Sequence, residues 1–357
     1  MASSMARQTT KHGAHRKPSA RLQSASQVTR NDVARLARTS TAVVSYVVND
    51  GPRPVSEATR VRVLAAIKKL GYRPNRLAQA LRKRRSGLVG LILPDTETPY
   101  FSALATAVES ELFARGLLAL IGSSGFDHWR ETRYAEAFAD LQVDGLLIAS
   151  VGPSDGQANG HTPQETPTVY IHRAGPDPSW PLVAHDDVAA GDVATQHLLD
   201  HGHKAVLCVA GLADGPIGDR VIGWERALRR AGIKRKAPML LRIPNNRAEA
   251  TRAAVAWLAD NPQASAVFAA TDELAFGVIR AAATLGRRIP DDLALIGCDG
   301  LEEGEHSVPR LSSVRLSLRP MAEAAIGRLL GESQSDVPAR ITIPVTLITR
   351  ESCGCHR

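Results

Sequence analysis

From Leu88 onward, short apolar runs alternate with longer amphipathic stretches, and this alternation constrains the fold more than any other feature. Parallel strands connected by helices that cover both faces of a sheet produce such a pattern. The sequence therefore predicts an α/β fold with a doubly wound parallel sheet. The expected strands and helices are Leu88–Leu93, Phe101–Arg115, Leu117–Ile121, Gly145–Ile148, Val188–His201, Val206–Val209, Gly223–Ala231, Ala266–Ala269, Leu274–Leu285 and Leu293–Ile296.

The first 86 residues have a different charge balance from the rest of the chain. They contain 19 Lys and Arg against 3 Asp and Glu, whereas the remainder contains 25 against 33. Positive charge concentrated at one end is typical of a segment that binds a polyanion such as nucleic acid. Residues 1–27 contain no acidic residue and few apolar ones, so we expect a disordered basic tail there.

Helical periodicity begins after Val28. Two short helical patterns, 31–37 and 41–48, are separated by a tight turn, and a third pattern runs from 56 to 70. Such an arrangement predicts a helix-turn-helix whose second helix enters the major groove of DNA. An ordinary three-helix bundle with a solvated polar face is the alternative. We expect the apolar contacts to come from Val33, Leu36, Ala37, Val44, Val47, Val48, Val61, Leu64, Ile67 and Leu70.

Several function classes are disfavoured by what the 357 residues lack. No apolar run is long enough to span a membrane, and the N-terminus has no apolar signal region, so we expect a cytoplasmic protein. The chain has no Walker loop and no G-x-S-x-G elbow, and its glycine-rich loop at 209–218 departs from G-x-G-x-x-G. His197 and His201 lack the glutamate of an H-E-x-x-H motif. We therefore expect no catalysis and no cofactor.

The four cysteines fall into two pairs: Cys208 and Cys298 are expected to be reduced, whereas Cys353 and Cys355 could bind a metal or oxidise, although no metal site is assigned to them. Cys208 and Cys298 lie in strand-like runs, which is typical of buried core thiols. Cys353 and Cys355 form a C-x-C near the end of the chain. A metal site needs more ligands, and no second ligand pair stands nearby in the sequence.

The stretch from Val28 to Ser86 resembles the headpiece of the lactose/galactose repressor (LacI/GalR) family, and the likeness continues through Arg350-Glu351-Ser352. The resemblance implies a helix-turn-helix domain over 28–74, a hinge helix and linker over 75–86, and an effector-binding and dimerisation domain over 87–357. This last domain would have two subdomains like a periplasmic sugar-binding protein, with crossovers near Asp186, Leu316 and Arg340. The motifs that carry the resemblance are Asp32-Val33-Ala34, Val44-Ser45, Val47-Val48-Asn49, Val55-Ser56, Thr59-Arg60, Val63, Leu70-Gly71-Tyr72 and Pro74-Asn75.

The resemblance also implies which residues bind DNA. Thr41, Ala42 and Tyr46 match the positions that read bases, whereas Thr29, Asn49 and Ser56 would contact phosphates. Leu81 would enter the minor groove from the hinge helix and bend the duplex. The expected DNA-binding residues are Thr29, Thr41, Ala42, Ser45, Tyr46, Asn49, Ser56, Asn75, Ala78, Leu81 and Arg82.

Two residues depart from the family pattern in this region. Arg38 stands where the turn usually has glycine; a left-handed backbone there would cost roughly 1 kcal/mol. Tyr46 stands where some relatives carry arginine, and a phenol cannot make arginine's bidentate contact to guanine. The operator half-site should therefore differ from that of the arginine-bearing relatives.

For the effector, the resemblance implies a cleft at the carboxyl ends of the strands. Asp299 and Arg220 would bind polar groups of the ligand, and Tyr100 and Phe101 would cover a ring; alternatively or in addition, Arg220 and Asp299 form an internal ion pair. His172 replaces a frequent aspartate and adds a group that could titrate near neutrality. The expected effector residues are Asp95, Tyr100, Phe101, His172, Arg220, Thr271, Asp272 and Asp299.

The function implied is a homodimeric transcription regulator, a repressor that binds a palindromic DNA operator. A small effector, expected to be a carbohydrate or a derivative, would control its affinity for DNA, although the ligand could also strengthen binding. The chain has no leucine heptad before Arg357, so we expect dimers rather than tetramers. The alternatives are a global regulator controlled by a partner protein or corepressor and, more remotely, a solute-binding protein for a sugar.

Overall fold

The computed structural model describes residues 28–49, 51, 53–73, 85–150, 165–173, 179–212, 214–332 and 339–355. Contacts within the chain divide it between Gln79 and Ala80 into two compact units, which we call the headpiece and the body and describe separately. The expected basic tail and the expected DNA contacts of Asn75, Ala78, Leu81 and Arg82 lie outside the described residues.

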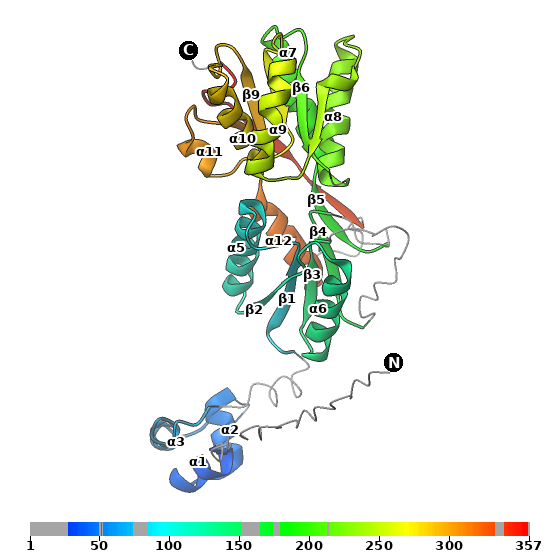
Figure 1. Cartoon of the computed structure of the whole chain (residues 1–357). Helices are drawn as coiled ribbons and strands as arrows, with labels where there is room; N and C mark the ends of the chain where they lie inside the picture. Colours follow the sequence, from blue (N-terminus) through cyan, green and yellow to red (C-terminus); the bar gives the residue numbers. More distant parts are fainter. Residues whose placement is uncertain are drawn as a thin grey trace, which may run out of the picture. The chain divides into compact units, whose positions relative to one another are not determined.

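The described part of the headpiece contains three helices, α1 (Arg30–Leu36), α2 (Thr41–Asn49) and α3 (Glu57–Leu70) (Figure 1). Thr29 and Asp32 form a capping box that begins α1, and the Ser40 hydroxyl accepts from the Val43 amide at 3.3 Å to begin α2. Gly71 ends α3 with a left-handed φ of 63°. Local sequence signals thus set where these helices begin and end.

The core of the headpiece differs from the expected one on α3. Val61 and Leu64 are 56% and 50% exposed, so their expected burial is wrong, and Leu36 of α1 is also exposed. Two apolar stripes are possible on α3, and packing against α1 selects the stripe that contains Val63, because tertiary contacts override a weak periodicity. The buried residues are Val33, Ala34, Ala37, Val44, Val47, Val63 and Ala66.

Arg38, in the turn between α1 and α2, has a φ of 52°. This is the left-handed conformation that we considered because Arg38 stands where the family usually has glycine. A side chain with a Cβ is strained in this region, whereas glycine is not.

We expect Arg38→Gly to stabilise the headpiece by up to about 1 kcal/mol, because relief of the left-handed strain exceeds the added flexibility of the unfolded chain. Hydrogen exchange of the α1 and α2 amides in the full-length protein measures this local stability. Arg35→Gly, within α1, is the matched control and should lose about 1 kcal/mol. Equal losses for both variants would contradict the strain argument.

The described residues of the body form two six-stranded sheets in two subdomains, which confirms the expected α/β architecture (Figure 1). In the first subdomain the strand order is β11-β5-β4-β3-β1-β2, and every pairing is parallel. Its elements are β1 (Leu88–Leu93), α5 (Pro99–Ala114), β2 (Leu118–Ser123), α6 (His128–Asp140), β3 (Gly145–Ile148), β4 (Thr168–Ile171), β5 (Leu182–His185), α12 (Leu318–Leu329) and β11 (Arg340–Ile343).

In the second subdomain the order is β12-β10-β9-β8-β6-β7, and only the pairing of β10 with β12 is antiparallel. Its elements are α7 (Asp187–Asp200), β6 (Leu207–Gly211), α8 (Pro216–Arg230), the 3-10 turn η1 (Ala237–Met239), β7 (Leu240–Ile243), α9 (Arg247–Asp260), β8 (Ala266–Ala269), α10 (Asp272–Thr284), β9 (Ala294–Asp299), α11 (Glu303–His306), β10 (Ser312–Leu316) and β12 (Val345–Ile348).

The chain passes between the two subdomains three times: between β5 and α7, between β10 and α12, and between β11 and β12. At the first passage Asp186 caps α7 by accepting from the Ala189 amide at 2.9 Å. The residues that line the cavity described below lie near the carboxyl ends of the strands of both sheets. Within the described residues, no helix is long and apolar enough to cross a membrane.

Helices α7 and α8 pack backbone against backbone in the second subdomain. A Cβ added at Gly191 of α7 would lie 1.8 Å from the Arg220 carbonyl oxygen, and one added at Gly223 of α8 would lie 2.0 Å from the Val188 carbonyl oxygen. Only glycine permits this approach. The contact sets the position of Arg220, which belongs to α8 and is central to the site.

Candidate effector cavity and DNA-reading surface

A cavity of about 490 Å³ lies between the two subdomains of the body. The first subdomain contributes residues after β1, β2, β3 and β4, and the second contributes residues at or after the ends of β6, β7, β8 and β9. Its size suits a small molecule. Of the expected effector residues, Tyr100, Phe101, His172, Arg220, Thr271 and Asp299 line this cavity.

Arg220 is the most constrained polar residue of the cavity, with only 1% of its surface exposed. Its Nε donates to Asp187 Oδ1 at 2.8 Å, and its Nη1 donates to Asp299 Oδ1 at 3.0 Å and to the Ala270 carbonyl at 2.6 Å. The internal ion pair considered for Arg220 and Asp299 therefore exists. It also fixes the guanidinium in one orientation at the cavity wall.

Asp299 ends β9 with a strained backbone, because its φ is 130° in a residue that has a Cβ. Its Oδ2 faces the Asp272 amide at 3.4 Å. Burial raises the pKa of Asp299, and the Arg220 guanidinium acts in the opposite direction. A carboxylate held in this way at the wall can accept a hydrogen bond from a ligand hydroxyl.

An aromatic wall lies on the side of the first subdomain. The Tyr100 hydroxyl is 3.0 Å from His172 Nδ1, and the rings of Tyr100 and Phe101 meet edge to face at 5.3 Å. Phe126, which the sequence did not single out, extends this wall at 6.4 Å from Phe101 and is largely exposed. Such a wall fits against the flat face of a ring.

The expectation that His172 could titrate near neutrality is wrong. Burial, and after it the charge of Arg220, lowers the pKa of His172 well below its usual range. The ring therefore stays neutral at neutral pH and acts as a hydrogen-bonding partner rather than as a charge.

Two expected effector residues do not line the cavity. Asp95 accepts from the Glu97 and Thr98 amides and from the Thr98 hydroxyl, so it shapes the loop that precedes α5. Asp272 accepts from the Ser313 hydroxyl at 2.6 Å and from the Leu301 amide at 2.8 Å. Because neither carboxylate lines the cavity, unlike that of Asp299, we do not propose either as a ligand contact.

The cavity also contains polar residues that the sequence reasoning missed. Asn245 accepts from the Thr271 hydroxyl at 2.7 Å, and among the described contacts its amide nitrogen has no partner. Arg173 and Asp214 line the cavity from opposite subdomains. Asn245 and Arg173 each follow a strand by two residues, so the rule that sites gather at the carboxyl ends of parallel strands pointed to both.

On the headpiece, the expected base-reading positions differ in exposure. Thr41 and Ala42 are exposed at the beginning of α2, whereas Ser45 and Tyr46 are half-buried. The Tyr46 ring packs over Gly51, where an added Cβ would lie 2.5 Å from the ring. The phenol therefore has a restricted direction, which favours a specific contact over a mobile one.

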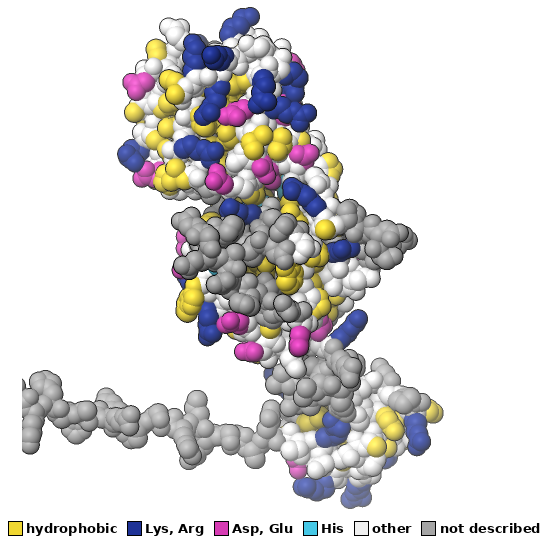
Figure 2. All heavy atoms as spheres, turned by 90° about the vertical axis from the view of Figure 1, so that its right-hand side faces the viewer, with side chains coloured by type: hydrophobic (Ala, Val, Ile, Leu, Met, Phe, Trp, Pro, Cys, Tyr) yellow, Lys and Arg dark blue, Asp and Glu magenta, His cyan; other side chains and the backbone are white. Residues whose placement is uncertain are grey.

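The side chains that we expect to contact phosphates already form hydrogen bonds within the headpiece. The Thr29 hydroxyl takes part in the capping box, and the Asn49 amide donates to the Ser45 carbonyl at 2.9 Å and to its hydroxyl at 3.1 Å. The Ser56 hydroxyl donates to the Thr59 hydroxyl at 3.0 Å, so this N-cap residue of α3 makes no side-chain capping bond to the backbone. Arg30, Thr41 and Arg73 line one shallow groove, and Figure 2 shows Lys and Arg side chains standing out on the headpiece.

Comparison with known proteins places these two units in one family. Residues 29–75 match the model of bacterial regulatory proteins of the lacI family, and residues 195–353 match a periplasmic binding protein-like domain. The ribose operon repressor of Halalkalibacterium halodurans is 31% identical over 326 residues, which cover 90% of this chain and 96% of the relative. The chain belongs to the LacI family. It is thus a transcriptional regulator of the DNA-binding type, as its headpiece and body led us to expect.

Other LacI-family members show the same extent of similarity. The ribose operon repressor of Escherichia coli K12 is 33% identical over 85% of this chain and 92% of its own. Two solved structures resemble the fold. A transcriptional regulator CelR–cellobiose complex has 30% identity, covers 91% of this chain and all of its own, and gives a TM-score of 0.66. A lac repressor dimer bound to operator and an anti-inducer has 25% identity, covers 92% of this chain and 99% of its own, and gives a TM-score of 0.81.

Proposed function

We propose that this LacI-family regulator is a homodimeric repressor that binds a palindromic operator and responds to a small polyhydroxylated ring compound in the cavity of the body. The observation that carries the proposal is Arg220, fixed between Asp187 and Asp299 opposite the aromatic wall. A ligand that stacks on the wall and bonds to Arg220 and Asp299 touches both subdomains at once.

This geometry supports control by subdomain closure. Because the cavity is lined from both subdomains, a ligand binds the closed arrangement more tightly than an open one and shifts the equilibrium toward it. Linkage requires that the same shift changes the affinity for DNA, if the operator also prefers one arrangement. Whether the ligand weakens or strengthens operator binding depends on which arrangement the operator prefers.

A carbohydrate is the ligand class that best fits the lining. Carboxylate, guanidinium and amide groups bind hydroxyls, and aromatic faces cover the apolar side of a sugar ring. The CelR structure contains cellobiose, and two of the relatives are repressors of ribose operons. We assign no catalytic role to this lining, since Arg220 is engaged with Asp299 and, behind the lining, with Asp187.

The dimer surface that we propose lies along α5 and the neighbouring edge strand β2. Phe113, Leu118 and Ile121 are 66%, 42% and 48% exposed there. Apolar side chains gathered on a sheet edge favour association with a second copy, and a two-fold dimer presents two headpieces symmetrically. This arrangement accounts for the palindromic operator.

Selection of sites from random DNA by the full-length protein at fixed salt tests the proposed function. We expect enrichment of a palindrome, and we expect one member of a panel of pentoses, hexoses and disaccharides to change the affinity for that site. Enrichment without any sugar response would favour control by a partner protein or corepressor instead. Binding to all sequences alike would contradict operator recognition.

Tyr46→Ala should weaken binding to the selected operator by roughly tenfold or more while binding to random DNA changes little, because base contacts specify and phosphate contacts do not. Fluorescence anisotropy on both duplexes at one salt concentration measures the ratio. Arg73→Ala is the control, since removal of a charge should weaken both duplexes similarly. A parallel loss on both for Tyr46→Ala would remove its assigned role.

A further inference from the structure

Four side chains with metal-binding atoms meet at the carboxyl end of α7, far from the cavity residues just described. Cys355 Sγ lies 3.1 Å from His197 Nε2, 3.2 Å from His201 Nε2 and 3.1 Å from Cys353 Sγ. The ligand atoms of His197, Cys353 and Cys355 all lie within 4.8 Å of one another. The sequence reasoning missed this cluster because the histidines stand more than 150 residues before the C-x-C.

The two histidines belong to one helix face. Residues four apart lie one above the other on an α-helix, and the rings of His197 and His201 are 4.3 Å apart between centroids. His201 Nδ1 lies 2.8 Å from the His197 carbonyl oxygen, to which it can only donate. A metal-ligating histidine is typically oriented by a hydrogen bond from its other ring nitrogen, and the Nδ1 bond of His201 is of this kind. It leaves the Nε2 lone pair free to face Cys355.

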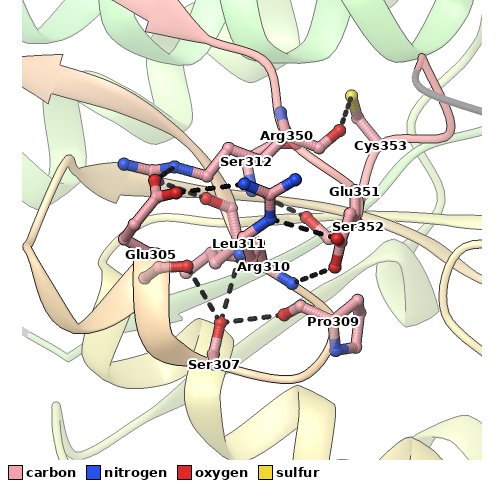
Figure 3. A network of polar contacts seen from close by, with 11 residues as sticks. Glu305, Ser307, Pro309, Arg310, Leu311, Ser312, Arg350, Glu351, Ser352 and Cys353 are labelled. Carbon is pink, nitrogen blue, oxygen red and sulfur yellow. Dashed lines mark hydrogen bonds and ion pairs between the residues drawn. The ribbon is translucent and has the colours of Figure 1, made fainter.

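The segment that carries the two cysteines is firmly held on the second subdomain (Figure 3). The Ser352 hydroxyl donates to the Leu295 carbonyl at 2.6 Å and accepts from the Ser312 amide at 2.8 Å. Arg310 Nε donates to Glu351 at 3.0 Å, and the Arg350 amide donates to the Ser312 hydroxyl at 2.8 Å. These bonds fix the backbone just before Cys353, which is buried and whose Sγ lies within 4.8 Å of the ligand atom of His197 on α7.

We propose that His197, His201, Cys353 and Cys355 form a structural zinc site that fastens the C-terminal segment to α7. Two thiolates and two imidazoles are a donor set that Zn²⁺ binds tetrahedrally, and four protein ligands leave no position open for catalysis. In such a site the sulfurs lie roughly 3.8 Å apart, given Zn–S bonds of about 2.3 Å. The two sulfurs, now 3.1 Å apart, therefore need to separate by less than ~1 Å to admit the ion. His201 Nε2 contacts Cys355 Sγ but lies outside the close group formed by the other three ligand atoms, so it has to move toward that group when the ion binds.

Zinc uptake has a defined proton balance. Both cysteines bind as thiolates, and two protons leave as the two Zn–S bonds form. Oxidation state does not change, so no oxidant or reductant takes part.

The test is zinc binding by the full-length protein, purified with a phosphine reductant and dialysed against Zn²⁺. We expect one zinc per chain by native mass spectrometry and elemental analysis, and a rise in Tm on zinc addition. Replacement of zinc by Co²⁺ should give the intense visible absorption of a tetrahedral thiolate site. Cys355→Ser and His201→Ala should each lower zinc affinity at least ~10-fold.

Cys208→Ala is the matched control, since Cys208 is a buried thiol of β6 that should leave zinc binding unchanged. Cys355 and His201 are at least partly exposed, so their variants should fold, and circular dichroism checks this. Zinc content that is well below one per chain, or that is equal in Cys355→Ser and the parent, would overturn the proposal. So would recovery of a Cys353–Cys355 disulfide in place of zinc in a parallel preparation that is purified without the reductant.

Discussion

Arg220→Ala is expected to destabilise the body by about 3–5 kcal/mol and to abolish its response to effector. Removal of the guanidinium leaves Asp187 and Asp299 buried without the partner that holds both of them. Uncompensated buried carboxylates are costly, which is why loss of one member of a buried ion pair has effects of this size. Urea unfolding of the full-length protein, followed by circular dichroism, measures the loss.

Arg230→Ala is the matched control for this prediction. Arg230 lies on the same helix α8 and also pairs with a carboxylate, that of Asp192, at 2.7 Å, but its side chain is 47% exposed. An exposed pair contributes little, so we expect a loss below about 1 kcal/mol and an unchanged effector response. Similar losses for Arg220→Ala and Arg230→Ala would show that the buried triad does not stabilise the body as argued.

Gly191→Ala is expected to destabilise the body by about 3 kcal/mol or more and to lower the yield of folded protein. The added methyl group would meet the Arg220 carbonyl oxygen at 1.8 Å and the Trp224 amide nitrogen at 3.0 Å. Both are backbone atoms of α8, so no side-chain rotation relieves the clash and the two helices have to move apart. The movement would also displace Arg220 from Asp187. Thermal unfolding of the full-length protein measures the effect.

Gly327→Ala, in the interior of α12, is the control for Gly191→Ala. Among the described residues, its nearest neighbour to an added Cβ is Glu332 Oε2 at 3.6 Å, an ordinary contact distance. Since alanine is a better helix former than glycine, this variant should be stabilised by up to about 1 kcal/mol. A Gly191→Ala protein that unfolds at the same temperature as Gly327→Ala would refute the close α7–α8 contact.

The elements that were predictable from the sequence are those with strong local signals. Strands β1, β3 and β8 begin and end where the apolar runs do, because a fully buried strand is apolar throughout. The helix expected at Gly223–Ala231 instead begins at Pro216, since proline suits the first turn of a helix and here extends it by two turns. On α3 the periodicity is weak and allows two apolar stripes, so the prediction of its buried residues was partly wrong.

Some of the expected site residues line the cavity and others do not. Arg220, Asp299 and Thr271 were identified through the family resemblance and do line the cavity. Asp95 and Asp272 follow strands just as closely, yet their carboxylates bond to the protein instead. The difference depends on the direction of each side chain and on which donors surround it, and neither is visible in a linear pattern.

The sequence by itself determined the alternation of strands and helices, the basic headpiece and membership of the LacI family, and it raised the left-handed turn at Arg38, which the structure then showed. These follow from local periodicity, charge and motif spacing, which act over a few residues. Only the tertiary structure decided which carboxylates pair with Arg220, that α7 and α8 meet at Gly191, and that His197 lies beside a cysteine 158 residues away. Packing alone brings such distant segments together, so their chemistry appears only when the chain is folded.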